Sequence, residues 1–455
     1  MRGRGLLALG LVYLCAMLAI FKPWIHGRDG AAYYAWLRSA VIDRDLDTYN
    51  ELQHYQNVQD VDLQSNVWRD DAGRTQTGLW INHWPVGSAV LWAPFFLLAH
   101  AATQILNLLG LGFAANGYSP PYVWLSMFGS TTWALLGLLL VYGIARELYD
   151  DRTATLAAAS IWLASPLVFY MFMYPTMSHA NDAFANAAFV CVWYKTRRER
   201  GYTGWVALGL SAGLAGLVRT QNVLLAVFPS LELAADLVRQ LRLRAWHEVR
   251  HSVIKAGLFA IALLTAFVPQ MVVWKAVFGS YIVLNPIQIS MGLGFDLRSP
   301  HWLKVLFSSN RGLFVWHPIL LPATLGLWFL AKRERRLALM LVVGFLLQLY
   351  LIGSYDAWHS SPAFGARYFV NMLPMFVLGL AALTDWMQQR LSFTPLIAAA
   401  AAFALWNFSL IVQYSLQLVP RFGPVALSKM VQNQFLVVPR YLGRVAGLML
   451  SRLSW

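Results

Sequence analysis

Residues 6–25 read LLALGLVYLCAMLAIFKPWI. An apolar run of about 20 residues is long enough to cross the hydrocarbon of a bilayer as a helix. Comparable runs recur along the whole 455-residue chain, in which 58% of the residues are hydrophobic and only 12% are charged. Soluble globular domains contain about 45–50% apolar and about 25% charged residues. The sequence therefore predicts a polytopic membrane protein in which residues 6–25 form a retained first span and not a cleaved signal.

The net charge of +14 indicates membrane topology. Eighteen of the 35 Lys and Arg residues fall in six short stretches next to apolar runs, at residues 2–4, 146–152, 195–200, 239–255, 332–336 and 390. Cytoplasmic loops of membrane proteins carry such an excess of basic residues. A nucleic-acid partner is therefore not expected.

With the basic stretches placed inside, the chain is predicted to be a single all-α membrane domain over residues 1–455 with about 11 transmembrane helices. The predicted spans lie near residues 5–25, 121–145, 153–172, 180–195, 203–218, 221–238, 256–277, 312–331, 337–353, 367–386 and 394–416. The segment Trp84–Leu109 is apolar enough to be a span, but crossing there would place Arg146 and Arg152 outside. We therefore predict that this segment is an interfacial helix lying in the membrane plane.

Residues 26–120 then form a long first outer loop. Residues 31–41 within it are predicted to be an amphipathic surface helix with Tyr33 and Leu37 on one side, and residues 50–78 a polar loop. A basic amphipathic tail is predicted at 417–455, along a membrane face. The outer loop carries nine acidic residues against five Arg, which fits either solubility or function: Asp29, Asp43, Asp45, Asp47, Glu51, Asp60, Asp62, Asp70 and Asp71.

Two acidic residues stand at predicted outer helix starts. Asp29 precedes an apolar run, where it fits an ordinary N-cap, a general base or a metal ligand. Asp182 follows His179 by three residues in the segment Tyr174–Asp182, so both side chains could meet a metal ion or a phosphate. In the competing interpretation Asp182 only favours the helix dipole and Ser178 caps the helix.

Two arginines interrupt apolar sequence at predicted outer span ends, Arg219 and Arg367. A guanidinium at that depth is costly unless it is paired, and it can grip an anionic headgroup with two hydrogen bonds. Snorkelling or a structural ion pair are the alternatives. Four other residues that reach the outer face have weaker claims: Lys275, Arg311, His317 and His359. The chain has no phosphate-cradling Gly-rich loop.

Several motifs together resemble the GT-C glycosyltransferases, above all bacterial enzymes related to the protein O-mannosyltransferases and the aminoarabinose transferases of lipid A. They run along nearly the whole chain: RDGAAYY (28–34), NHWPVG (82–87), YPTMSH (174–179), GLVRTQN (216–222), VPQ (268–270), SSNRGLFVWHP (308–318) and FGARY (364–368). The resemblance implies a catalytic role for Asp29, with Asp182 near the place of a second acidic residue. It implies that Arg219 and Arg367 hold a carrier phosphate.

The resemblance also extends to four further candidate substrate-binding residues: Tyr174, His179, His83 and Arg311. His83 stands beside Trp84, at which relatives carry a basic residue. A divalent metal ion is a candidate cofactor, with Asp29, Asp182 and His179 as its candidate ligands.

The implied reaction moves a sugar from a polyprenyl-phosphate donor to a lipid, glycan or protein acceptor, with inversion at the anomeric carbon. It would take place on the outer side of the plasma membrane. A transporter or flippase of lipid-linked glycans is the competing class, but such proteins usually show inverted repeats and ionisable residues near the midplane. In this sequence the ionisable residues collect at the span ends. A non-catalytic scaffold would leave Arg219 and Arg367 without a role.

Overall fold

The structure is a computed structural model that describes residues 3–59, 73–360 and 362–444, and the described part is built from helices. Part of two sequence predictions lies outside the described residues. These parts are four acidic residues of the predicted outer loop, Asp60, Asp62, Asp70 and Asp71, and the end of the predicted basic tail. The helical elements are α1 (Arg4–Ile20), α2 (Gly27–Arg38), η1 (Ser39–Asp43), α3 (Tyr49–Gln59), α4 (Gly87–Leu108), α5 (Pro120–Leu148), α6 (Asp151–Leu163), η3 (Phe169–Met173), α7 (His179–Thr196), α8 (Tyr202–Val218), η4 (Thr220–Ala226), α9 (Val227–Arg242), α10 (Trp246–Phe278), α11 (Pro286–Met291), α12 (Trp302–Phe307), α13 (Leu313–Trp316), α14 (Leu320–Leu325), α15 (Leu327–Arg333), α16 (Arg335–Ser354), η5 (Arg367–Met372), α17 (Leu373–Gln388), α18 (Phe393–Ser415), α19 (Leu427–Gln432) and η6 (Asn433–Val437).

The predicted all-α membrane fold is confirmed. Within the described ranges, seven helical segments are long and apolar enough to cross a membrane: α4, α5, η4 with α9, α10, α16, η5 with α17, and α18. Two shorter apolar helices, α1 and α8, add to them. Each of the eleven predicted spans falls on helical structure. The predicted helix at 84–109 is α4, and its placement in the membrane plane stays a prediction.

Two predicted spans are broken helices. The span at 312–331 is divided into α13, α14 and α15, and α13 ends just before His317-Pro318. A residue that precedes proline is driven out of the helical region, which explains the break. The span at 153–172 is divided into α6 and the π-helical turn η3, with Pro166 between them.

The first long loop differs from its prediction in two ways. Residues 49–59 form the helix α3, where a polar loop was predicted. The predicted helix at 31–41 exists as α2 and η1, but all residues from Gly30 to Arg38 are buried. An amphipathic surface helix is therefore the wrong description, because other parts of the protein cover α2 on both faces.

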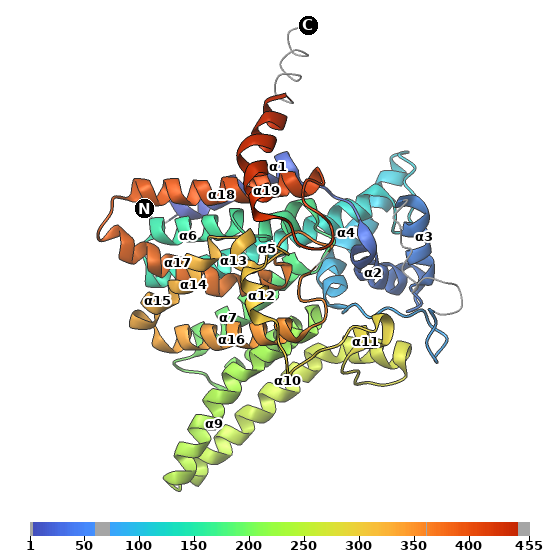
Figure 1. Cartoon of the computed structure of the whole chain (residues 1–455). Coiled ribbons are helices and arrows are strands. Elements are labelled where there is room, and N and C mark those ends of the chain that lie inside the picture. The colour runs from blue at the N-terminus through green and yellow to red at the C-terminus, as the bar shows by residue number, and fades with distance from the viewer. Residues whose placement is uncertain (1–2, 60–72, 361, 445–455) are drawn as a thin grey trace.

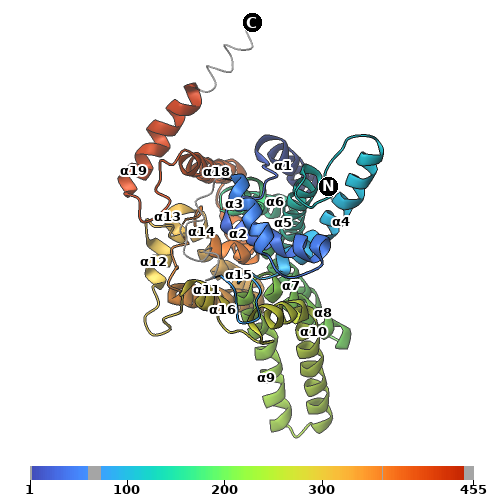
Figure 2. The same cartoon turned by 90° about the vertical axis from the view of Figure 1, so that its right-hand side faces the viewer.

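The helices form a bundle from which one hairpin projects. In Figures 1 and 2, α6, α16, α17 and α18 lie in the body, and α9 and α10 extend away from it together. The upper part of α10 packs along α8, where Gly209 and Gly213 face backbone atoms of Phe259 and Leu263 so closely that a Cβ would overlap them. Small residues four apart allow two membrane helices to approach in this way.

Two of the six basic stretches, 195–200 and 332–336, meet at one end of the bundle. Arg197, just after α7, pairs with Glu334 before α16 at 2.9 Å, and Arg333 lies 3.8 Å from Asp385 near the end of α17. The opposite ends of the same helices begin at His179 and, through η5, at Arg367. Because a helix rises about 1.5 Å per residue, the 18 residues of α7 separate its two ends by about 27 Å. The candidate site residues therefore lie at the end far from the basic stretches.

Candidate active site

Asp29 lies in the first turn of α2 but does not cap it. The residue at the N-cap is His26, and no side chain makes a capping hydrogen bond there. The carboxylate of Asp29 instead pairs with Arg367, whose Nη1 lies 3.4 Å from Oδ2. The Asp29 side chain is 34% exposed. The N-cap interpretation is thus wrong, and the carboxylate is partly open to solvent.

The neighbouring Gly30 lets α2 approach the segment before α7. A Cβ at Gly30 would lie 2.5 Å from Oγ1 and 2.8 Å from Cβ of Thr176, which is too close for any larger residue. Gly27 adopts a positive φ of 70°, and a Cβ there would overlap the hydroxyl of Tyr174. Tyr174 also packs edge-on against His26, with ring centroids 5.5 Å apart. Burial and then the nearby charge of Asp29 raise the pKa of Tyr174. The structure therefore places Tyr174 beside Asp29.

Arg219 stands where α8 ends, in extended backbone between α8 and η4. Its Nε lies 3.6 Å from Oδ2 of Asp182, and its Nη1 lies 3.3 Å from Nδ1 of His179. The same Nη1 donates to the hydroxyl of Ser178 at 3.4 Å. Ser178 makes no capping hydrogen bond to α7, and its hydroxyl donates to the buried hydroxyl of Tyr33 at 3.1 Å. The predicted Ser178 cap is therefore wrong.

Asp29 and Asp182 differ in accessibility. The Asp182 side chain is 1% exposed, and its Oδ1 accepts from the amides of Asn186 at 2.9 Å and Asn222 at 2.6 Å. A carboxylate in that position is fully occupied by protein partners. It sits in the first turn of α7, as the helix-dipole interpretation predicted.

Tyr368 joins the two arginines. The guanidinium of Arg219 lies 5.5 Å from the centroid of the Tyr368 ring and that of Arg367 lies 5.4 Å from it. Both distances are within the usual range for cation–π contacts. The structure thus brings Asp29, Asp182, Arg219 and Arg367, which come from four separate parts of the chain, into one site. The contribution of Tyr368 was missed, although it directly follows Arg367 in the sequence.

His83 and Arg311 have other neighbours. The Nδ1 of His83 lies 2.6 Å from the hydroxyl of Ser290, and burial and then the charge of Arg28 lower the pKa of His83 to about 3. A neutral imidazole is a weak partner for a phosphate. Arg311 donates to the carbonyl oxygens of Ala363 at 2.6 Å and Arg421 at 2.6 Å. Arg311 therefore ties the segment before η5 to the segment after α18.

The metal candidates do not form a cluster. Among the described residues, no group of three or more His, Cys, Asp or Glu side chains is arranged to hold a metal ion. Asp29 is paired with Arg367, and Asp182 with Arg219.

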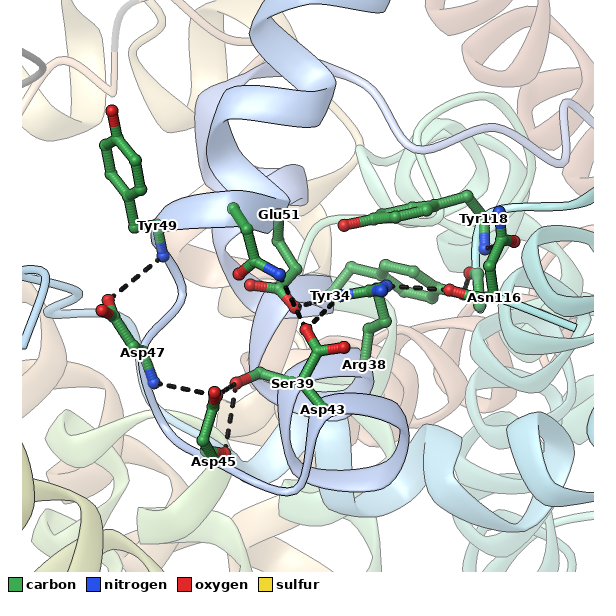
Figure 3. Close-up of polar contacts among 12 residues, drawn as sticks. Tyr34, Arg38, Ser39, Asp43, Asp45, Asp47, Tyr49, Glu51, Asn116 and Tyr118 are labelled. Carbon is green, nitrogen blue, oxygen red and sulfur yellow. Dashed lines mark hydrogen bonds and ion pairs between the residues drawn. The ribbon is translucent and has the colours of Figure 1, made fainter.

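A second polar cluster holds the other end of α2, and sequence reasoning missed it (Figure 3). Arg38 bonds to Asp43 and, at 2.6 Å, to the fully buried Glu51 of α3, and its Nε donates to the carbonyl of Asn116 at 2.8 Å. Burial raises the pKa of Glu51 to about 8, and Asp43 adds to this. The cluster fastens α2 to α3 and to the segment before α5, and so fixes the helix that carries Asp29. The only signal in the sequence was an arginine among many acidic residues.

Known proteins are similar to parts of this chain in sequence and to all of it in fold. The undecaprenyl phosphate-alpha-4-amino-4-deoxy-L-arabinose arabinosyl transferase 2 of Sodalis glossinidius (strain morsitans) is 30% identical over 125 residues, which cover 27% of this chain and 22% of that protein. The corresponding transferase of Pseudomonas aeruginosa (strain UCBPP-PA14) is 30% identical over 135 residues, which cover 29% of this chain and 22% of that protein. No protein-family model matches the chain.

A solved structure matches the whole chain. ArnT from Cupriavidus metallidurans, bound to undecaprenyl phosphate, superposes with a TM-score of 0.57 at 15% sequence identity and covers 100% of this chain and 72% of that one. The fold predicted from the motifs, that of the GT-C glycosyltransferases, is thereby confirmed. The sequence matches span about a fifth of the length of the curated relatives. The resemblance to the aminoarabinose transferases is also confirmed.

Proposed function

We propose that this chain is a membrane glycosyltransferase that moves a sugar from an undecaprenyl-phosphate donor to an acceptor at the outer face of the membrane. The observation that carries the proposal is the convergence of one accessible carboxylate, Asp29, and two guanidinium groups, Arg219 and Arg367, around Tyr368. The names of the curated relatives include the same class of donor, and undecaprenyl phosphate is bound in the ArnT structure. The distant basic end of the bundle supports an outer location for the site.

The donor would be held by its phosphate and by its prenyl tail. Arginine binds phosphate oxygens through its fork of N–H groups, and Arg219 and Arg367 are the two candidates at the site. A mainly apolar groove of about 530 Å³ begins next to Arg219, at Thr220 and Gln221, and runs between η4 and α9 on one side and Leu351 of α16 on the other. An apolar groove that starts beside the phosphate clamp suits the first isoprene units of a lipid carrier.

The transfer then needs one base and charge stabilisation on the leaving group. In the proposed reaction Asp29 takes the proton of an acceptor hydroxyl, and the acceptor oxygen attacks the anomeric carbon from the side opposite the phosphate. The bond between the anomeric carbon and the phosphate oxygen breaks, and its electron pair leaves with the carrier phosphate. Arg219 and Arg367 stabilise that charge. Asp182 is too deeply buried to meet an acceptor, so we assign it to holding Arg219.

The transporter alternative is not favoured. The titratable groups named above gather at one end of the bundle around an exposed carboxylate. The fold matches that of ArnT over the whole chain. A flippase would move a lipid-linked sugar without cleaving its bond to phosphate.

The test is a transfer assay on the purified protein in nanodiscs with synthetic undecaprenyl-phosphate sugars, among them 4-amino-4-deoxy-arabinose. Release of undecaprenyl phosphate together with a glycosylated acceptor, or with free sugar as a slow hydrolysis product, is the expected result. Proteoliposomes that move the intact lipid-linked sugar between leaflets, without any release, would reject the enzyme and favour the transporter.

A further inference from the structure

Each arginine of the site is followed by an asparagine about one helical turn later. Arg219 precedes the 3₁₀ segment η4, which contains Asn222, and Arg367 opens the 3₁₀ segment η5, which contains Asn371. Both asparagines are buried, with exposed fractions of 3% and 2%. Burying an amide side chain costs free energy unless its polar atoms form hydrogen bonds. The partners of these two amides therefore show what they do.

The two amides bond to each other and to Asp182. The Nδ2 of Asn371 donates to Oδ1 of Asn222 at 3.1 Å. The Nδ2 of Asn222 donates to Oδ1 of Asp182 at 2.6 Å and to the carbonyl of Ala215, near the end of α8, at 2.9 Å. Asp182 in turn pairs with Arg219 through its other oxygen. We call Asp182, Asn222 and Asn371 the amide strap.

The amide strap links the two segments that carry the arginines. In addition to the covalent chain, hydrogen bonds of the Asn222 side chain connect η4 to α7 through Asp182 and to η5 through Asn371. From the other side of η5, Gln348 of α16 donates to the carbonyl of Tyr368 at 2.9 Å. The ring of Tyr368 lies against both guanidinium groups. The segments η4 and η5, which follow the two arginines, are therefore held by one connected set of hydrogen bonds.

We propose that Asn222 and Asn371, acting with Asp182, are positioning residues that set the spacing of Arg219 and Arg367 for the carrier phosphate. The inference rests on the proposed function, because it assigns these two arginines to one phosphate. Two arginines bind one phosphate more tightly when their separation is fixed before the ligand arrives, because less conformational entropy is then lost on binding. A 3₁₀ segment is a poorly bonded helix that adjusts easily, so side-chain bonds are needed to hold it.

The test measures binding of undecaprenyl phosphate to the full chain in nanodiscs for Asn371→Leu, Arg219→Ala and the double variant. Leucine is close to asparagine in shape and removes the donor to Asn222. The Oδ1 of Asn371 has no hydrogen-bond partner in the part of the chain that the structure describes. Asn371→Leu therefore removes one bond and one unpaired acceptor, and it leaves the Oδ1 of Asn222 unpaired instead, so the number of unpaired buried acceptors stays the same. We expect its melting temperature to stay close to that of the wild type.

Binding should change although stability does not. We expect Asn371→Leu to weaken binding of undecaprenyl phosphate about 3- to 10-fold, the equivalent of one buried hydrogen bond. In the Arg219→Ala background the same substitution should change binding less than about 2-fold. Only Arg367 then contacts the phosphate, so the spacing between two arginines no longer affects binding. Asn407→Leu is the matched control, since Asn407 is 1% exposed and bonds to the carbonyls of Leu163 and Ser165. It should lower the melting temperature and leave binding unchanged.

The outcomes separate the two proposals. Wild-type binding in Asn371→Leu, or effects of Asn371→Leu and Arg219→Ala that simply multiply, would overturn the positioning role while the proposed function stands. Arg219→Ala and Arg367→Ala variants that bind undecaprenyl phosphate as tightly as the wild type would instead remove the phosphate clamp. The positioning role would then be rejected as well, because it depends on phosphate binding by these two arginines.

Discussion

Replacing Asp29 by Asn tests the central residue of the proposed reaction. Asp29 makes no capping bond, so the substitution removes only its charge and its pairing with Arg367 at 3.4 Å. The Asp29 side chain is 34% exposed, and ion pairs with such access to solvent contribute about 0–1 kcal/mol to folding. The loss of a general base costs about 10²- to 10⁴-fold in rate. We therefore expect a folded protein whose transfer rate falls at least about 100-fold.

The assay follows transfer from a synthetic undecaprenyl-phosphate sugar, together with the melting temperature and the binding of undecaprenyl phosphate. Asp47→Asn is the matched control, because Asp47 pairs with Arg74 at 3.0 Å and is 29% exposed in the same long loop. The control should keep its transfer rate, and Asp29→Asn should still bind the carrier. Near-full transfer by a folded Asp29→Asn variant would refute the assignment of Asp29 as the base.

Three further outcomes are expected. Arg219→Ala and Arg367→Ala should weaken donor use about 10-fold or more, and Lys should restore it poorly because it lacks the planar fork, as donor titrations of the transfer rate would show. Because burial raises the pKa of Glu51 to about 8, above its usual value near 4.5, its protonated form stabilises the fold, and this contribution is present below about pH 4.5 and lost as the pH rises through 8. Thermal unfolding between pH 6 and pH 9.5 should therefore show a loss of stability that Glu51→Gln removes, and an unchanged pH profile in that variant would contradict this. Single cysteines at Ala115 and Arg197, placed in a chain freed of its native cysteines, should react with an impermeant label only at Ala115, and labelling of both from the outside would reject the topology.

The sequence was sufficient for the fold because hydrophobic length and charge asymmetry are local signals. Each of the eleven predicted spans falls on helical structure, and two of the six basic stretches meet at one end of the bundle. The errors lie in the first long loop. The pattern of residues 31–41 cannot show that other parts of the chain cover α2 on both faces, and the polar composition of 49–59 hid the helix α3. Burial by distant segments is a tertiary property that periodicity does not encode.

The charged members of the candidate site could be predicted, but Tyr368 and the pairings could not. Asp29, Asp182, Arg219 and Arg367 were all named as candidates, because a charged residue beside or within apolar sequence is costly unless it is paired or has a function. Which carboxylate faces which arginine depends on how α2, α7, η4 and η5 come together. The glycine next to Asp29, Gly30, also has a physical reason in this chain. A side chain there would overlap Thr176.

In the proposed reaction, burial divides the roles of two carboxylates that have the same chemistry. Asp29 and Asp182 each pair with one arginine, at 3.4 Å and 3.6 Å. The partners of Asp29 leave it partly open to solvent, so it can exchange a proton with an incoming hydroxyl. Asp182 accepts two buried amide bonds that an acceptor would have to break. A catalytic base must be reachable and a positioning residue must not be displaced, so we base the proposed assignment on the exposed fraction of each carboxylate and not on its distance to arginine.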